Sequence, residues 1–243
     1  ALGAEYEGKK VGTFGDISTL SFYPAHHITM GEGGAVFSNN SRLKKIIESI
    51  RDWGRDCWCE TGCDNTCKKR FDWKLGNLPH GYDHKYTYSN LGYNLKITDI
   101  QASIGLAQFS RLEEFINKRR ENFLYLNKLL FELNQYFILP KATPNSKPSW
   151  FGFPLTIKSQ SKIKRHHLIN YLEENGISTR LLFGGNIIKQ PYMLNQEYRV
   201  VGNLNVSNKI MNNSFWIGIY PGLRKKHLMH AYNTLEKYCK LYS

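Results

Sequence analysis

The chain has 243 residues, enough to bury a core and to divide into one large and one small domain. No run approaches the roughly 18 apolar residues of a membrane span, so we expect a cytoplasmic protein without a membrane partner. The 33 Lys and Arg against 20 Asp and Glu give a net charge of +13. These positive residues are dispersed and no nucleic-acid-binding motif accompanies them, so we expect no nucleic acid partner and attribute part of the charge to a phosphate-rich substrate.

The first predicted elements are two strands, from Ile17 to Tyr23 and from Ala35 to Phe37. Between them lie a loop begun by Pro24, two adjacent histidines and a glycine-rich turn. Clusters of Pro and Gly that interrupt strands predict loops. Loops held by rigid strands often carry functional groups, although most loop histidines are simply solvated.

A helix is predicted from Arg42 to Arg51, with Ser41 as its N-cap and apolar residues at helical spacing. From Asp56 to Leu91 the sequence has no clear periodicity, over a length that is uncommon for a loop inside a compact domain. Such loops are usually functional when they are ordered.

The second half of the chain predicts alternating helices and strands. Thr98 and Gln101 have the spacing of a capping box, which predicts a helix start, and Ser110 begins a second helix. The further predicted elements are the end of that helix near Leu133, a proline-marked linker (140–148), a strand (151–157), a helix from Ser161 to Asn175, a strand from Phe215 to Tyr220 and a helix from Leu223 to Tyr238.

Four of the five cysteines, Cys57, Cys59, Cys63 and Cys67, form the pattern C-x-C-x3-C-x3-C. In a cytoplasmic chain, thiols this close are more often metal ligands than disulfides. The spacing does not name the metal, since structural zinc favours C-x2-4-C pairs and iron–sulfur proteins vary more. Four reduced thiols in an irregular loop are the alternative. We expect Cys239 in the core.

The segments SFYPAHH (21–27) and GEGG (31–34) resemble the cofactor-lysine segment of the sugar aminotransferases that use pyridoxal phosphate (PLP). In that family a lysine stands at the position of His26 and binds the cofactor aldehyde covalently. An imidazole cannot form that bond, but it can move a proton near neutral pH. The exchange resembles a subfamily of sugar 3-dehydrases that keep the cofactor as pyridoxamine phosphate (PMP), and it implies that His26 is catalytic.

The resemblance extends from Ala1 to beyond Leu223. It implies an α/β, fold-type I PLP-dependent transferase-like fold. Residues 1–118 would form the C-terminal half of the large, cofactor-binding domain, with a cysteine-rich loop at 54–92, and residues 119–243 a small α+β domain. Because Ala1 resembles the middle of the family pattern, we expect the chain to be the C-terminal portion of a longer protein.

Two more residues receive roles from this resemblance. Ser21 matches the serine that donates to the cofactor phosphate, and Asn94 matches the asparagine that reaches the phosphate in the partner subunit, which implies a homodimer. Taken alone, a strand serine is usually structural, and Asn94 is equally well explained as a turn former. His27 matches an asparagine and is assigned no proton transfer, whereas Arg180 could contact a substrate diphosphate.

The subfamily that acts on CDP-4-keto-6-deoxy-D-glucose carries a [2Fe–2S] cluster on the pattern C-x57-C-x-C-x7-C. Cys57, Cys59 and Cys67 match its last three positions, so the first ligand would lie two positions before Ala1 and Cys63 would be a bystander or a substitute. The implied reaction removes the C3 hydroxyl of this sugar, on the path to 3,6-dideoxyhexoses of lipopolysaccharide. A separate NAD(P)H-dependent flavin iron–sulfur reductase would supply the electrons.

Three alternatives stay open at this point. A PMP-dependent GDP-sugar 3-dehydratase shares the His-for-Lys exchange but lacks the cysteine pattern, and an ordinary sugar aminotransferase relative is the second. The third is a basic binding module whose cysteine loop is held together by zinc. Metal analysis would then find zinc, and the protein would bind DNA or RNA in a salt-dependent way.

Overall fold

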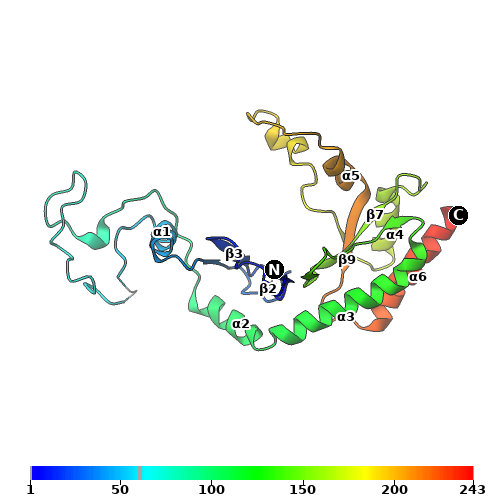
Figure 1. Ribbon diagram of the computed structural model, residues 1–243, viewed down its shortest axis with the longest axis horizontal. Coiled ribbons are helices and arrows are strands. Elements are labelled where there is room, and N and C mark those ends of the chain that lie inside the picture. Colours follow the sequence, from blue (N-terminus) through cyan, green and yellow to red (C-terminus); the bar gives the residue numbers. More distant parts are fainter. Residues whose placement is uncertain (1, 60–61, 243) are drawn as a thin grey trace. The chain divides into compact units, whose positions relative to one another are not determined.

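The structure is a computed structural model that describes residues 2–59 and 62–242 (Figure 1). The chain forms two compact units: unit 1 contains Val11–Ser110, and unit 2 combines Leu2–Lys10 with Arg111–Ser243. The assignment of residues 1–118 and 119–243 to two domains of the whole enzyme stays a prediction. No helix in the described part of the chain is both long and apolar enough to cross a membrane.

Unit 1 is built on an antiparallel hairpin. β3 (Ser18–Ser21) pairs with β4 (Gly34–Phe37), and Ser21 lies opposite Gly34. Both strands lie within the predicted ranges or within one residue of them. The described helical elements of this unit are α1 (Ser41–Arg51), η1 (His84–Tyr86) and α2 (Asp99–Phe109).

The helix starts of unit 1 show how local polar side chains set the element bounds. The prediction of Ser41 as the cap of α1 is wrong by one residue: the Asn40 side chain accepts from the backbone N–H groups of Arg42 and Leu43 at 2.9 and 3.3 Å. The capping box of α2 is confirmed, since Thr98 N–H donates to Gln101 Oε1 at 2.8 Å and Gln101 N–H donates to Thr98 Oγ1 at 3.3 Å.

Unit 2 is a mixed helix and sheet structure. Its main sheet is antiparallel and has the strand order β5-β7-β9-β8. The strands are β5 (Phe137–Ile138), β7 (Gly152–Ile157), β9 (Ser214–Gly218) and β8 (Thr179–Arg180). A smaller antiparallel sheet contains β2 (Lys9–Lys10), β1 (Glu5–Tyr6) and β6 (Ser146–Lys147).

Unit 2 contains the helices α3 (Leu112–Leu130), α4 (Arg165–Glu174), α5 (Asn205–Asn213) and α6 (Lys225–Cys239), with short 3-10 helices η2 (Phe131–Leu133), η3 (Ile187–Lys189), η4 (Pro191–Met193) and η5 (Lys240–Tyr242). The helices α3, α4 and α6 pack around a shared core, in which the long α3 runs beside α6 (Figure 1). Alternate residues of β7, Phe153, Leu155 and Ile157, are buried against them, as the period-2 pattern predicts. Cys239 is also in this core, as predicted.

Two predicted helix starts in unit 2 are wrong. Ser110 does not cap α3, because its hydroxyl donates to the carbonyl of Ala107 at 2.9 Å, and α3 begins at Leu112. Ser161 accepts from Ile163 N–H at 3.2 Å in a local turn, and α4 begins four residues later. The sequence patterns also missed α5 and the short strands β1, β2, β5, β6 and β8.

Candidate active site and cysteine loop

The hairpin of unit 1 presents the loop of residues 22–33, which we call the histidine loop. Its first turn is closed by a hydrogen bond from His26 N–H to the carbonyl of Tyr23 at 2.9 Å, with Pro24 at the second turn position, which its fixed φ favours. Phe22 ties the two ends together, since its carbonyl accepts from Met30 N–H at 2.9 Å. The loop is therefore ordered by its own backbone.

The paired histidines lie in different environments. The side chain of His26 is exposed, whereas His27 is 7% exposed and Ile28 only 3%. The chain therefore turns into the interior directly after His26 and leaves this imidazole at the surface of unit 1. Such a position lets the imidazole of His26 meet a ligand.

The other two predicted cofactor residues lie on different segments of unit 1. Ser21 ends β3, and its Oγ accepts from Tyr23 N–H at 3.2 Å, so its own O–H can donate to a bound phosphate oxygen. Asn94 pairs through its backbone with Asp52 just after α1, and its Oδ1 accepts from Lys96 Nζ at 3.3 Å. Ser21 thus ends the strand that leads into the histidine loop, while Asn94 belongs to the segment that pairs with the end of α1.

Sequence reasoning missed a set of contacts between α2 and the histidine loop. The amide of Gln108 bonds to both the backbone N–H and the carbonyl of Thr29. Gln101 Nε2 donates to the carbonyl of Glu32 at 3.0 Å. The signal that could have found them is their separation of seven residues, which puts two glutamines on one face of a helix.

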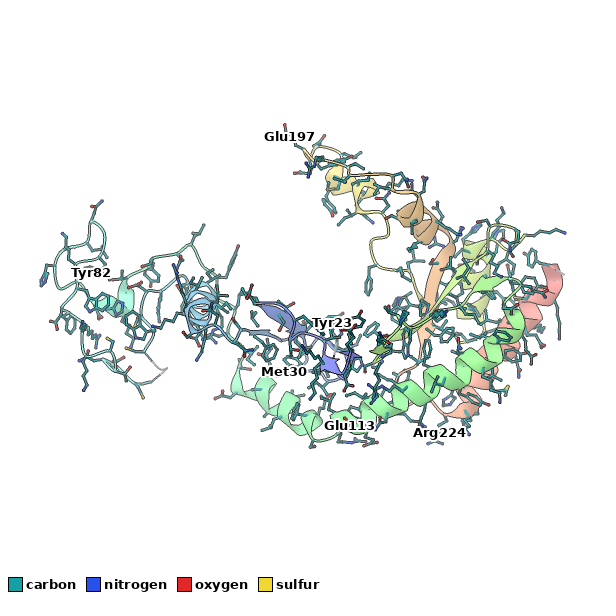
Figure 2. The ribbon with its side chains drawn as sticks, in the orientation of Figure 1. Tyr23, Met30, Tyr82, Glu113, Glu197 and Arg224 are labelled. Atoms are coloured by element: carbon teal, nitrogen blue, oxygen red, sulfur yellow. The ribbon has the colours of Figure 1, made fainter. Side chains whose placement is uncertain are left out.

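Residues 56–59 and 62–91 form the described part of the cysteine loop, which is held by ion pairs. Arg70 makes two parallel hydrogen bonds to Asp83, at 3.0 and 2.7 Å, a geometry that is among the stronger charged pairs. The Arg70 guanidinium holds the pKa of Asp83 below its usual range. Asp64 also pairs with Lys85 at 2.7 Å. Within unit 1, Tyr82 of this loop lies well apart from Tyr23 of the histidine loop (Figure 2).

A buried histidine organises the centre of the cysteine loop. His84 is 1% exposed, and its Nε2 lies 2.8 Å from Asp56 Oδ2, which fixes Nε2 as the protonated nitrogen when the ring is neutral. Its Nδ1 faces Cys67 Sγ at 4.0 Å. Trp73 stacks on the ring at 5.0 Å between centroids and Trp58 meets its edge at 5.1 Å. No periodic pattern in the sequence indicated this residue.

The structure brings together the three cysteines predicted as ligands. Cys59 accepts hydrogen bonds from the hydroxyl of Thr66 and from the thiols of Cys57 and Cys67, and these lower its pKa to about 7. Burial raises the pKa of Cys57. The thiols line a pocket of about 210 Å³. The thiolate, rather than the thiol, is the form of cysteine that binds metals, so a lowered pKa favours metal binding at neutral pH.

The described geometry stops short of a metal site. Among residues 2–59 and 62–242, no group of three His, Cys, Asp or Glu side chains has the arrangement of a metal site. Cys63, which the pattern gave as a bystander, is exposed. The donor set is nevertheless thiolate-rich, which suits iron–sulfur clusters or zinc. The ligand roles of Cys57, Cys59 and Cys67 therefore stay a prediction.

Comparison with known proteins decides the family. Residues 1–236 match the model of the DegT/DnrJ/EryC1/StrS aminotransferase family. The chain belongs to this family. The match covers both units, and it confirms the resemblance on which the role of His26 depends. Enzymes of the DegT/DnrJ/EryC1/StrS family use PLP or PMP, so a B6 cofactor is the family expectation for this member.

Two curated relatives are similar over 98% of the chain. One is the lipopolysaccharide biosynthesis protein RfbH of Salmonella typhimurium, 61% identical over 238 residues that make up 54% of that protein. The other is dTDP-4-dehydro-2,6-dideoxy-D-glucose 3-dehydratase of Saccharopolyspora spinosa, 50% identical over 51% of its length. The chain thus spans about half the length of the curated relatives it matches.

Solved structures of the same family confirm the fold class. GDP-4-keto-6-deoxy-D-mannose-3-dehydratase of E. coli, with bound hydrated PLP, superposes with a TM-score of 0.80 at 26% identity and covers 96% of this chain and 57% of its own. DesV of S. venezuelae superposes with a TM-score of 0.77 at 20% identity, over 98% of this chain and 56% of its own. The expected PLP-dependent transferase-like fold is therefore correct.

Proposed function

We propose that the protein containing this chain is a PMP-dependent 3-dehydrase that removes the C3 hydroxyl of CDP-4-keto-6-deoxy-D-glucose with the help of a [2Fe–2S] centre. The observation that carries the proposal is the exposed imidazole of His26 at the position where the family pattern has its cofactor lysine. Two relatives named as 3-dehydratases, from Saccharopolyspora spinosa and Yersinia pseudotuberculosis, support the reaction class.

The residues of the histidine loop fit a B6 cofactor that is held without a covalent bond. Ser21, at the end of β3, offers a hydroxyl donor for the phosphate, and the loop that follows it offers a proton-transfer group at His26. When bound, PMP supplies an amine that can join the sugar ketone and a ring that takes up electrons. His26 would then act as general base and take a proton from the amine-bearing carbon of the cofactor, because an imidazole exchanges protons near neutral pH. The same imidazole would give that proton to the leaving hydroxide, which departs as water.

The cysteine loop is the proposed place of the iron–sulfur centre. A [2Fe–2S] cluster takes four protein ligands, typically cysteine thiolates. Cys57, Cys59 and Cys67 supply three, and the lowered pKa of Cys59 favours its thiolate form. We propose a cysteine two positions before Ala1 as the fourth. An NAD(P)H-dependent flavin iron–sulfur reductase would be the electron donor.

A homodimer and a cytoplasmic location complete the proposal. In it, Asn94 reaches the cofactor phosphate of the partner subunit. The support for this role is the motif match, together with the exposure of Asn94 on a segment fixed by backbone pairing to Asp52.

The test of the proposal is His26→Asn in the complete protein, with His166→Asn in α4 as the control because it is another exposed histidine. We expect His26→Asn to lower kcat for sugar elimination by about 100-fold or more, the usual contribution of general acid–base catalysis. PMP affinity, measured by fluorescence titration, should stay at the wild-type value. Retained turnover in His26→Asn would contradict the base role.

A second candidate is a PMP-dependent 3-dehydratase that needs no electron transfer. It is favoured by the similarity to the E. coli GDP-sugar enzyme. Iron content and visible absorption of the complete protein separate the two. The first candidate predicts that Cys59→Ala loses both signals while Cys63→Ala keeps them, because Cys63 is exposed and lies outside the predicted ligand set.

A further inference from the structure

The histidine loop is attached to α2 by one glutamine, whose side-chain amide bonds to both the backbone N–H and the backbone carbonyl of a single loop residue. Gln108 Oε1 accepts from Thr29 N–H at 3.1 Å, and Gln108 Nε2 donates to the carbonyl of the same residue at 3.0 Å. The two bonds use the acceptor and a donor of one side-chain amide, so they fix its orientation and the peptide it faces. They join residues 79 apart in the sequence.

Other contacts on the same helix face support this attachment. Gln101, two turns earlier, donates to the carbonyl of Glu32 at 3.0 Å. Gly105 lies between the two glutamines, and a Cβ there would approach the Cε of Met30 to 2.6 Å, so the absence of a side chain lets Met30 pack against the helix (Figure 2). The face of α2 is therefore shaped to hold the second half of the histidine loop.

This attachment bears on the position of His26 through a short piece of chain. On one side, His26 is fixed by the turn to the carbonyl of Tyr23 at 2.9 Å. On the other side, His27 and Ile28 are buried, and Thr29 is held by Gln108. Only two residues, His27 and Ile28, separate Thr29 from His26, so a shift of Thr29 is passed on to His26.

We propose that Gln108 is a positioning residue, whose amide fixes the Thr29 peptide and thereby sets the direction of the His26 imidazole toward the bound cofactor and sugar. The inference rests on the proposed function, because it takes His26 as the proton-transfer group. Gln108 acts through the loop, because both of these hydrogen bonds go to the backbone of Thr29. Misplacement of a catalytic group by about 1 Å can cost on the order of 100-fold in rate. The two bonds from Gln108 to Thr29 would prevent such a misplacement of His26.

The experiment compares three variants of the complete protein. Gln108→Ala removes both bonds, whereas Gln108→Glu keeps the shape and the acceptor for Thr29 N–H but loses the donor. Ser103→Ala is the matched control, since Ser103 is an exposed residue of α2 whose hydroxyl bonds only to the carbonyl of Ile100 at 2.7 Å. For each we would measure amide hydrogen exchange, PMP affinity, kcat and the KM for the sugar.

In Gln108→Ala we expect faster exchange confined to residues 22–31, PMP affinity and KM close to wild type, and a kcat lowered by about 10-fold to 100-fold. Gln108→Glu should fall between this variant and the wild type, and Ser103→Ala should match the wild type. Unchanged exchange at residues 22–31, an unchanged kcat, or faster exchange throughout unit 1 would each overturn the positioning role.

The hydrogen-exchange result does not depend on the chemistry, so the two proposals can fail separately. In one case, exchange at residues 22–31 rises and kcat falls in Gln108→Ala, while His26→Asn remains active. Gln108 then holds the loop, but His26 is not the group whose position matters. This result overturns both the base role of His26 and the positioning role assigned to Gln108. If His26→Asn is inactive and Gln108→Ala is wild type, only the positioning role is lost.

Discussion

The two units of the chain are held together by different kinds of interaction. Unit 2 has a continuous apolar core in which residues such as Phe153 and Leu168 are fully buried. In the described part of unit 1, Phe22 and Ile28 are the buried apolar side chains. Unit 1 instead relies on polar contacts such as Gln108 with Thr29. The difference teaches that, among the described residues, the candidate chemistry of unit 1 is positioned by specific hydrogen bonds and ion pairs, whereas unit 2 contains the apolar core.

The largest expected effect comes from opening the core of unit 2. Phe153→Ala should lower the free energy of unfolding of this unit by about 3–5 kcal/mol, because a fully buried aromatic side chain is lost and a cavity remains. Leu91→Ala should change the free energy of unfolding of unit 1 by less than about 0.5 kcal/mol, since this side chain is 100% exposed. Urea denaturation measures both, and equal effects would break the contrast between the units.

The next effect tests how the cysteine loop is closed. Gly54 has φ of +80°, and a Cβ there would collide with the backbone oxygen of Asn90. Gly54→Ala should therefore open the ends of the loop and cost about 2 kcal/mol or more, seen as faster proteolysis within residues 56–91. Gly76→Ala is the control, because Gly76 also has positive φ, +53°, but its Cβ would meet nothing within 4 Å. A protease pattern that is the same in both variants would show that backbone strain alone matters.

The smallest expected effect comes from removing a pH-dependent contact in unit 2. The backbone N–H and the hydroxyl of Thr179 both donate to the Glu173 carboxylate and lower its pKa. Because the folded pKa lies below the unfolded value of about 4.3, the stabilisation is present above that pH and is lost as the pH falls through the folded pKa. Since the carboxylate is solvent-exposed, Glu173→Gln should cost no more than about 0.5 kcal/mol at pH 7.

Thermal unfolding at pH 7 and pH 3 checks this last prediction. The difference between Glu173→Gln and wild type should shrink as the pH falls from 7 to 3, because the Glu173 carboxylate becomes protonated in that direction. Glu174→Gln, at the neighbouring exposed position, should match the wild type at both values of pH. A difference that persists at pH 3 would mean that the contact does not depend on the charge of Glu173.

The contrast between the units also explains which features the sequence could predict. The strand β7 was found because Phe153, Leu155 and Ile157 alternate, and α2 because Thr98 and Gln101 carry a local capping signal. These are short-range patterns, and they report burial or a helix end directly. His26 was singled out by its place in a motif; the family match confirms the family, and the role of His26 stays a prediction.

The missed features depend on contacts that no local pattern encodes. Gln108 bonds to Thr29 across 79 residues, and His84 meets Asp56 across 28 residues of irregular loop. Polar residues in loops have no periodicity to show which partner they meet. Ser41 was predicted as the cap of α1, although Asn40 caps it, because adjacent residues that can both cap a helix are equivalent in the sequence until the backbone places one of them.

The most direct test of the central claim is to ask which lysine of the complete protein can bind PLP covalently. The protein would be incubated with PLP, reduced with borohydride and mapped by peptide mass spectrometry. The account predicts no modified active-site lysine in the wild type, and a modified residue 26 in His26→Lys. PLP attached to an active-site lysine of the wild-type protein would contradict the claim that an imidazole stands in place of the cofactor lysine.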